Sequence, residues 1–196
     1  MQHKCKVTVI DKKLYPELQA QYCADPNSGM CSVYNVGDEY VFERYGKADH
    51  FWRIGLGTLT KSDGGARVAG SAQFPHCSEA WDAISRYIYT ALQGGSIMRG
   101  WTNDERVMIA CCSDGTRPVI FKIERQDYKV LYIDGISCEE CEERISAALR
   151  SISDVKDVVF RREEGFTEVF LERDVADEAL KQAVGSCGGY TVTKID

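Results

Sequence analysis

Two cysteines three residues apart, Cys138 and Cys141, form a compact pair of soft metal ligands in the sequence. They belong to the segment Gly135-Ile136-Ser137-Cys138-Glu139-Glu140-Cys141, which lies where an expected strand gives way to an expected helix. One cysteine in the loop and one on the first helical turn can converge on a single ion, and a helix N-terminus favours thiolates. Two protein ligands leave coordination positions open, which suits a transferable ion and differs from closed four-ligand structural sites. The alternative for a CxxC pair alone is a thioredoxin-like redox motif.

The two glutamates between the thiols have two interpretations. Ser137 and Glu140 match the Ser-x-x-Glu capping box, which would leave Glu139 in solvent. Alternatively, a carboxylate offers an oxygen ligand to Zn(II) or Cd(II). Their negative charge disfavours an anionic two-thiolate Cu(I) complex and helps a divalent ion.

The elements that must position this pair alternate clearly over residues 126–196. Apolar alternation predicts strands and 3.6-residue periodicity predicts helices. We expect a strand at 128–134, a helix to about Ser151, strands at 155–161 and 166–172, a helix at about 175–187 capped by Asp174, and a strand at 190–195. The order is βαββαβ, a ferredoxin-like arrangement.

Residues 126–196 resemble the heavy-metal-associated domain of copper chaperones and of metal-transporting P-type ATPases. The resemblance rests on Gly-x-x-Cys-x-x-Cys after the first strand, Ala147-Ala148-Leu149, Val155-Lys156-Asp157-Val158 and Gly189-Tyr190. It implies that Cys138 and Cys141 are the ligands, that Tyr190 lies near the ion, and that the ion is Cu(I), with Zn(II) or another soft divalent ion as the alternative. Cys187 is either a core residue of the second helix or a third thiol ligand.

Residues 1–125 are expected to form an α+β module. We expect strands at 4–10, with Cys5 facing inward, and at 39–45, loops with a hairpin over 50–74, a helix capped by Ser78 and ended by Gly94-Gly95, and strands at 106–112 and 117–124. The fold class is therefore α+β, with a C-terminal ferredoxin-like domain fused to this module. The boundary falls at residues 124–128.

The first module has six cysteines, none in a CxxC motif: Cys5, Cys23, Cys31, Cys77, Cys111 and Cys112. Adjacent residues on a strand face opposite ways, so Cys111 is expected in the core with Val107 and Ile109, and Cys112 on the other face. Cys77 precedes the expected cap, where a helix terminus favours its thiolate.

This module resembles a family of small prokaryotic proteins without a known activity. The resemblance rests on residues 4–9, on Cys77-Ser78-x-Ala80-Trp81-Asp82-x-Ile84 and on Cys111-Cys112-Ser113-Asp114-Gly115-Thr116-Arg117-Pro118-Val119-Ile120-Phe121-Lys122-Ile123. Family members carry cysteines at five matching positions, Cys5, Cys31, Cys77, Cys111 and Cys112. A subset of these thiols could hold a second metal or an iron–sulfur cluster, or perform redox chemistry; the alternative is a set of buried or incidental cysteines.

Charge and composition limit the function. The chain has 196 residues and a net charge of −6, and residues 126–196 alone carry nine Lys and Arg against sixteen Asp and Glu, a net charge of −7. This acidity argues against nucleic acid and favours a basic protein partner, such as a metal-binding domain of a transport ATPase. No stretch is apolar enough to span a bilayer and the start lacks a secretory signal, so we expect a cytoplasmic protein.

Three functional hypotheses follow from these observations. The first is a metal chaperone or buffer that exchanges its ion through the thiol pair. The second is an enzyme, a thiol- or cluster-based metal reductase whose first module is catalytic and whose second module delivers the metal. The third is a regulatory role in which metal binding changes docking between the modules. Dinucleotide, Gly-x-Ser-x-Gly and His-Glu-x-x-His motifs do not occur, so an enzyme is the less favoured expectation.

Overall fold

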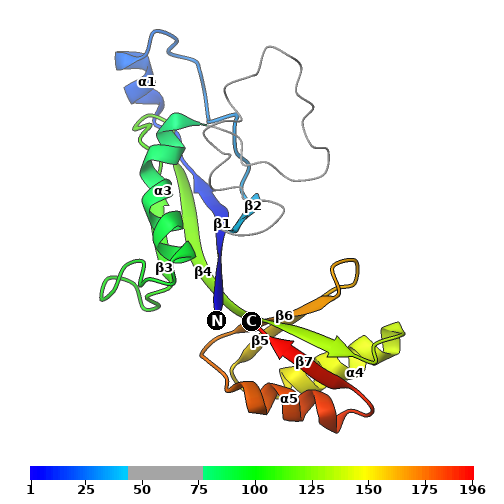
Figure 1. The fold of residues 1–196 in the computed structure, drawn as a ribbon. Helices are drawn as coiled ribbons and strands as arrows, with labels where there is room; N and C mark the ends of the chain where they lie inside the picture. Colours follow the sequence, from blue (N-terminus) through cyan, green and yellow to red (C-terminus); the bar gives the residue numbers. More distant parts are fainter. Residues whose placement is uncertain (44–76) are drawn as a thin grey trace, which may run out of the picture. The chain divides into compact units, whose positions relative to one another are not determined.

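A computed structural model describes residues 1–43 and 77–196. Its elements are β1 (Gln2–Lys12), α1 (Pro16–Tyr22), β2 (Glu39–Glu43), α3 (Ser78–Leu92), β3 (Val107–Cys111), β4 (Val119–Asp134), α4 (Glu139–Arg150), β5 (Val155–Arg161), β6 (Phe166–Leu171), α5 (Asp177–Ser186) and β7 (Thr191–Ile195) (Figure 1). The hairpin expected over 50–74 lies outside the described residues. No helix in the described ranges is long and apolar enough to cross a membrane.

The chain divides into two compact units. The C-terminal unit comprises Met1–His3 and Gln126–Asp196, and the N-terminal unit comprises Lys4–Arg125. Strand β4 is continuous through the boundary, so its first residues belong to the N-terminal unit and its last residues to the C-terminal unit. The sequence did not predict that the first three residues join the C-terminal unit, where His3 Nδ1 lies 2.7 Å from Asp127 Oδ1.

The C-terminal unit has the predicted ferredoxin-like fold. Strand β4 pairs with β7 on one side and β6 on the other, and β5 pairs with β6, all antiparallel, giving the order β7-β4-β6-β5. Helices α4 and α5 pack side by side against this sheet (Figure 1). The core between them includes the fully buried Leu131, Ile145, Leu149, Leu180 and Val184. The apolar stripe of each helix therefore faces the sheet, as the periodicity predicts.

The cap expected for α5 is wrong. Its N-cap is Ala176, without a side-chain hydrogen bond, and not Asp174. The carboxylate of Asp174 instead lies 3.0 Å from Nζ of Lys129, a strand residue whose side chain is only 9% exposed. Nζ of Lys129 also donates to Oδ1 of Asp177, at 2.8 Å. A charged ammonium group that is nearly buried needs an anionic partner. The carboxylate of Asp174 therefore pairs with Lys129 and does not cap α5.

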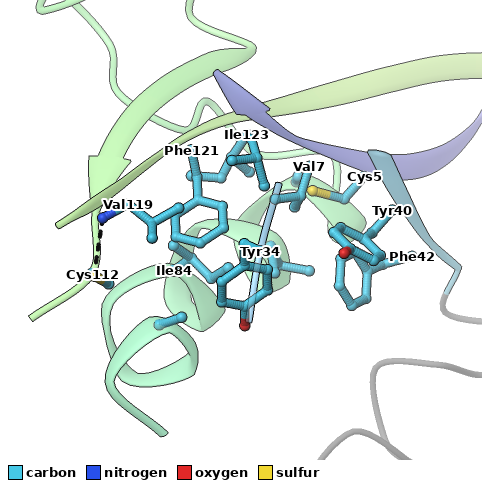
Figure 2. Close-up of a cluster of buried hydrophobic side chains, with 14 of the residues drawn as sticks. Cys5, Val7, Tyr34, Tyr40, Phe42, Ile84, Cys112, Val119, Phe121 and Ile123 are labelled. Carbon is cyan, nitrogen blue, oxygen red and sulfur yellow. Dashed lines mark hydrogen bonds between the residues drawn. The ribbon is translucent and has the colours of Figure 1, made fainter. Parts of the chain in front are cut away.

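The N-terminal unit packs helix α3 against a sheet in which β1 lies between β2 and β4, and β3 pairs with β4. Cys5, Val7 and Val9 face inward, as predicted, and Ile84 and Ile88 of α3 meet the same core. Figure 2 shows Tyr34 beside Phe121 at its centre, with ring centroids 5.3 Å apart in an edge-to-face arrangement. Such aromatic pairs stabilise a core beyond the area that they bury.

Two details of this unit differ from the prediction. Helix α3 begins at Ser78, so its N-cap is Cys77, whose carbonyl accepts from Trp81 N at 2.8 Å. Cys111 is exposed, on the same face as the exposed Ile109, whereas Cys112 is buried. Cys112 exchanges hydrogen bonds with Val119: its N–H donates to the carbonyl at 3.0 Å, and Val119 N–H donates to Sγ at 3.3 Å (Figure 2). Both faces of β3 are apolar in sequence, so the alternation alone could not select the inner one.

Candidate metal centre

The thiol pair lies where β4 leads into α4. Cys138 is the N-cap residue of α4, with an extended backbone, and Cys141 is the third helical residue. Cys138 is exposed and Cys141 is half-buried. The two form a disulfide, with Cα atoms 5.3 Å apart. When the disulfide is reduced, this backbone arrangement leaves both sulfurs close enough to bind one ion at the surface.

The capping box expected from Ser137 and Glu140 is not formed. Helix α4 begins one residue later than that motif requires, at Glu139, and no side chain caps it. The hydroxyl of Ser137 lies instead 3.9 Å from Sγ of Cys141. The N-cap position is therefore occupied by Cys138, whose thiol makes no capping hydrogen bond. A sulfur at a helix N-terminus lies where the helix dipole stabilises negative charge.

The loop before Cys138 lies close to the loop that carries Tyr190. Gly135 has φ +93°, and a Cβ atom there would lie 3.1 Å from the Gly189 carbonyl oxygen and 3.4 Å from Cδ1 of Tyr190. Only glycine tolerates both this backbone conformation and this proximity. The expectation that Tyr190 lies near the ion stays a prediction, and the contact with Gly135 is the observation that supports it.

The charged residues beside the pair include two that the sequence did not single out. Arg162, which follows β5, donates to both carboxylate oxygens of Glu142, with Nε–Oε1 2.6 Å and Nη2–Oε2 2.9 Å. Its Nη2 also lies 3.8 Å from Oε1 of Glu139. These residues are 20 positions apart, and only the folding of the β5–β6 hairpin against α4 joins them. The glutamates between the thiols, Glu139 and Glu140, are both exposed.

A cavity of about 300 Å³ opens beside Cys138. Its walls carry apolar side chains, among them Phe160 and Phe166, together with the paired Glu142 and Arg162. Cys138 also lines this cavity, whereas Cys141 does not. The lining also includes Arg161 and the polar Ser137 and Thr167, so a ligand or partner that reaches the Cys138 thiol meets a mixed apolar and polar surface with two arginines.

Cys187 is the C-cap residue of α5 and not a member of its buried core. Its thiol lies 3.1 Å from the carbonyl of Ala183, within the same helix, and 3.8 Å from that of Arg144. The expectation of a core position is therefore wrong. Within residues 1–43 and 77–196, no three His, Cys, Asp or Glu side chains form a group that could hold a metal ion. A third thiol ligand from Cys187 accordingly has no support in this geometry.

The cysteines of the N-terminal unit have unequal environments. Cys5 is completely buried, and burial raises the pKa of its thiol. Cys31 and Cys77 are half-buried against the core that contains Cys112. Burial raises the pKa of the Tyr34 hydroxyl, and the neighbouring Cys77, Cys31 and Cys112 contribute to the shift. Cys5, Cys31, Cys77 and Cys112 thus belong to or pack against the core that contains Tyr34, whereas Cys111 is exposed. A second metal, iron–sulfur or redox site in this unit stays a prediction.

The strand order and the two helices make the C-terminal unit a ferredoxin-like βαββαβ unit. Its thiol pair lies at the start of its first helix, where Cys138 is exposed. Solved structures similar to part of the chain include one described as the CopZ metallochaperone, at 28% identity, covering 34% of this chain and all of that one, with a TM-score of 0.31. Another is a putative copper-ion-binding protein from Bacillus anthracis, at 23% identity over 35% of this chain and 96% of that one, with a TM-score of 0.31.

A third is the N-terminal domain of a potential copper-translocating P-type ATPase from Bacillus subtilis in its Cu(I)-loaded state. It is 20% identical over 36% of this chain and 91% of that one, with a TM-score of 0.31. No family model and no curated protein sequence matches the chain. The resemblance of residues 1–125 to a family of small prokaryotic proteins therefore stays a prediction.

Proposed function

We propose that the C-terminal unit binds a soft metal ion, Cu(I), through Cys138 and Cys141 and passes it to an acceptor protein. The observation that carries this proposal is the placement of both thiols at the N-terminus of α4, with the exposed Cys138 as N-cap and the half-buried Cys141 on the first turn. Thiolate sulfur selects soft ions such as Cu(I), and two ligands leave the ion open to an incoming group. The names of two of the similar structures, a putative copper-ion-binding protein and a domain of a potential copper-translocating ATPase, agree with this choice of ion.

Transfer proceeds by ligand exchange without a change in oxidation state. A thiolate of the acceptor bonds to the ion, the bond from Cys138 or Cys141 breaks, and the released thiolate takes up a proton. The exposure of Cys138 makes it the side from which the acceptor approaches. Before the ion can bind, an external dithiol must reduce the disulfide between the two cysteines by thiol–disulfide exchange, becoming a disulfide itself and leaving both cysteines as thiols.

The acceptor is expected to be basic around its own thiols. Residues 126–196 carry a net charge of −7, so a positive partner surface would be attracted over a Debye length of about 8 Å at physiological ionic strength. A metal-binding domain of a transport ATPase is the partner that this chemistry suggests. The attraction should weaken as salt is added, mainly through slower association.

The test is Cu(I) binding to the full, reduced chain without oxygen, in competition with a chromophoric Cu(I) chelator. We expect Cys138→Ser with Cys141→Ser to remove one tightly bound ion per chain. The matched control is Cys23→Ser with Cys111→Ser, which removes two thiols of the N-terminal unit and should leave that ion in place. Unchanged stoichiometry and affinity in the first double variant would refute the proposal.

A further inference from the structure

The ion pair between Arg162 and Glu142 differs from the other charges around the thiols. The side chain of Glu142 is 14% exposed, whereas that of Glu139 is 83% exposed. Arg162 holds both oxygens of Glu142 in a two-pronged contact, a geometry that adds specificity as well as strength. The carboxylate of Glu142 is thus held closely, whereas the exposed Glu139 makes only a longer contact of 3.8 Å with the same arginine.

Glu142 is close enough to the thiols for its position to matter. It lies one helical turn after Cys138, and its backbone N–H donates to the Cys138 carbonyl at 3.4 Å. Helical residues four apart have Cβ atoms about 6 Å from each other. Cys138, Glu142 and Arg162 also line the same cavity. A Glu side chain released from Arg162 therefore has the reach to place an oxygen near an ion on Cys138.

We propose that Arg162 sets the metal selectivity of the Cys138–Cys141 site by holding Glu142 away from the ion. This inference rests on the proposed function of the thiol pair. With Glu142 held, the site offers two sulfurs, which suits Cu(I). With Glu142 released, two sulfurs and one oxygen form a set suited to Zn(II) or Cd(II), ions that prefer more ligands and accept carboxylate oxygen.

Two further observations agree with this arrangement. No group of three metal-ligating side chains exists within residues 1–43 and 77–196, although Glu142 adjoins Cys141 in sequence. The hydrogen bonds and charge of Glu142, with a contribution from Glu139, raise the pKa of Arg162. The guanidinium group thus remains charged and available to compete with a divalent ion for Glu142.

The test compares Zn(II) and Cu(I) affinities of the full, reduced chain by chelator competition in four proteins. These are the wild type, Arg162→Ala, Arg162→Ala with Glu142→Gln, and Arg161→Ala. We expect Arg162→Ala to bind Zn(II) about tenfold more tightly, equivalent to about 1.4 kcal/mol, without tighter Cu(I) binding. Adding Glu142→Gln should abolish the gain, because it removes the oxygen ligand.

Arg161→Ala is the matched control. It removes the same charge one residue away, but Arg161 pairs with Glu168 of β6, with Nη2–Oε2 2.9 Å. It should bind Zn(II) like the wild type. An equal gain in Arg161→Ala would assign the effect to general charge, and a gain that persists in the double variant would exclude Glu142 as a ligand; either result overturns the inference.

A spectroscopic readout separates ligation from folding. The ¹¹³Cd resonance of the Cd(II)-loaded Arg162→Ala protein should move toward the range of mixed sulfur and oxygen ligands, and return when Glu142→Gln is added.

Zn(II) retained by a Cys138→Ser/Cys141→Ser protein gives the contribution of the other thiols. If the wild type shows no ion that depends on this pair, the proposed function fails. If that ion is present but Arg162→Ala leaves both affinities within twofold, only the selectivity inference fails.

Discussion

Replacing Gly135 by alanine tests whether the loop before Cys138 depends on its close contact with the Tyr190 loop. Gly135 has φ +93°, and an added Cβ would lie 3.1 Å from the carbonyl oxygen of Gly189, a backbone atom. A non-glycine residue in such a conformation costs about 1–3 kcal/mol. The backbone at Gly189 must also shift by a few tenths of an ångström. We expect Gly135→Ala to lower the free energy of unfolding of the C-terminal unit by about 2–3 kcal/mol.

Gly165→Ala supplies the control for this prediction. Gly165, in the β5–β6 turn, has φ +76°, but a Cβ there would meet no atom within 4 Å. Its substitution therefore measures the backbone term alone, about 1 kcal/mol. Gly185→Ala, within α5, has ordinary φ and open space around the new Cβ, and should stabilise by roughly 0.5–1 kcal/mol.

The assay is urea unfolding of the three reduced variants, followed by far-ultraviolet circular dichroism. Small units lose about 1–3 kcal/mol of unfolding free energy per molar urea, so a loss of 2 kcal/mol lowers the unfolding midpoint by roughly 0.7–2 M. From the highest urea midpoint to the lowest, we expect the order Gly185→Ala, wild type, Gly165→Ala, Gly135→Ala. A Gly135→Ala midpoint equal to or above that of Gly165→Ala would refute the close contact as the source of the effect.

Two more predictions concern the N-terminal unit. In the native, reduced protein, a thiol reagent should modify the exposed Cys111 at least tenfold faster than the buried Cys5, whose pKa is raised; equal labelling in a mass-spectrometric time course would contradict the burial of Cys5. The pKa of Asp104 is lowered to about 2, mainly by a side-chain hydrogen bond from Arg106. The ionised Asp104 therefore stabilises the fold above pH 4, and this stabilisation is lost as the pH falls toward 2. Asp104→Asn should therefore cost about 1 kcal/mol at pH 7, after allowance for solvent screening, and progressively less below pH 4; a cost independent of pH in denaturant titrations would exclude the ion pair as its origin.

The sequence by itself determined the fold of the C-terminal unit. Apolar periods of two and of 3.6 residues separated strands from helices, and the order βαββαβ left the ferredoxin-like sheet as the arrangement that buries all stripes together. The thiol pair was equally readable, because Cys138 and Cys141 are neighbours in sequence and their junction with a helix is a local feature.

Only the tertiary structure decided the details that depend on competition between distant groups. Asp174 was expected to cap α5, but the buried Lys129 takes its carboxylate. Cys111 ends a strand whose faces are both apolar, so the sequence could not show that Cys111 is exposed and that Cys112, which follows the strand and bonds to Val119, is buried. The sequence around Asp174 or Cys112 could not predict these contacts, because the partners Lys129 and Val119 belong to another element.

The same reason explains what the sequence could not say about the candidate site. The residues that were missed, Arg162 and Glu142, belong to a turn and a helix that meet only in the folded unit. Local sequence supplied the two sulfurs and the helix terminus beside them. The fold supplied the arginine that holds a carboxylate next to them, because electrostatic partners are selected by distance in space and not along the chain.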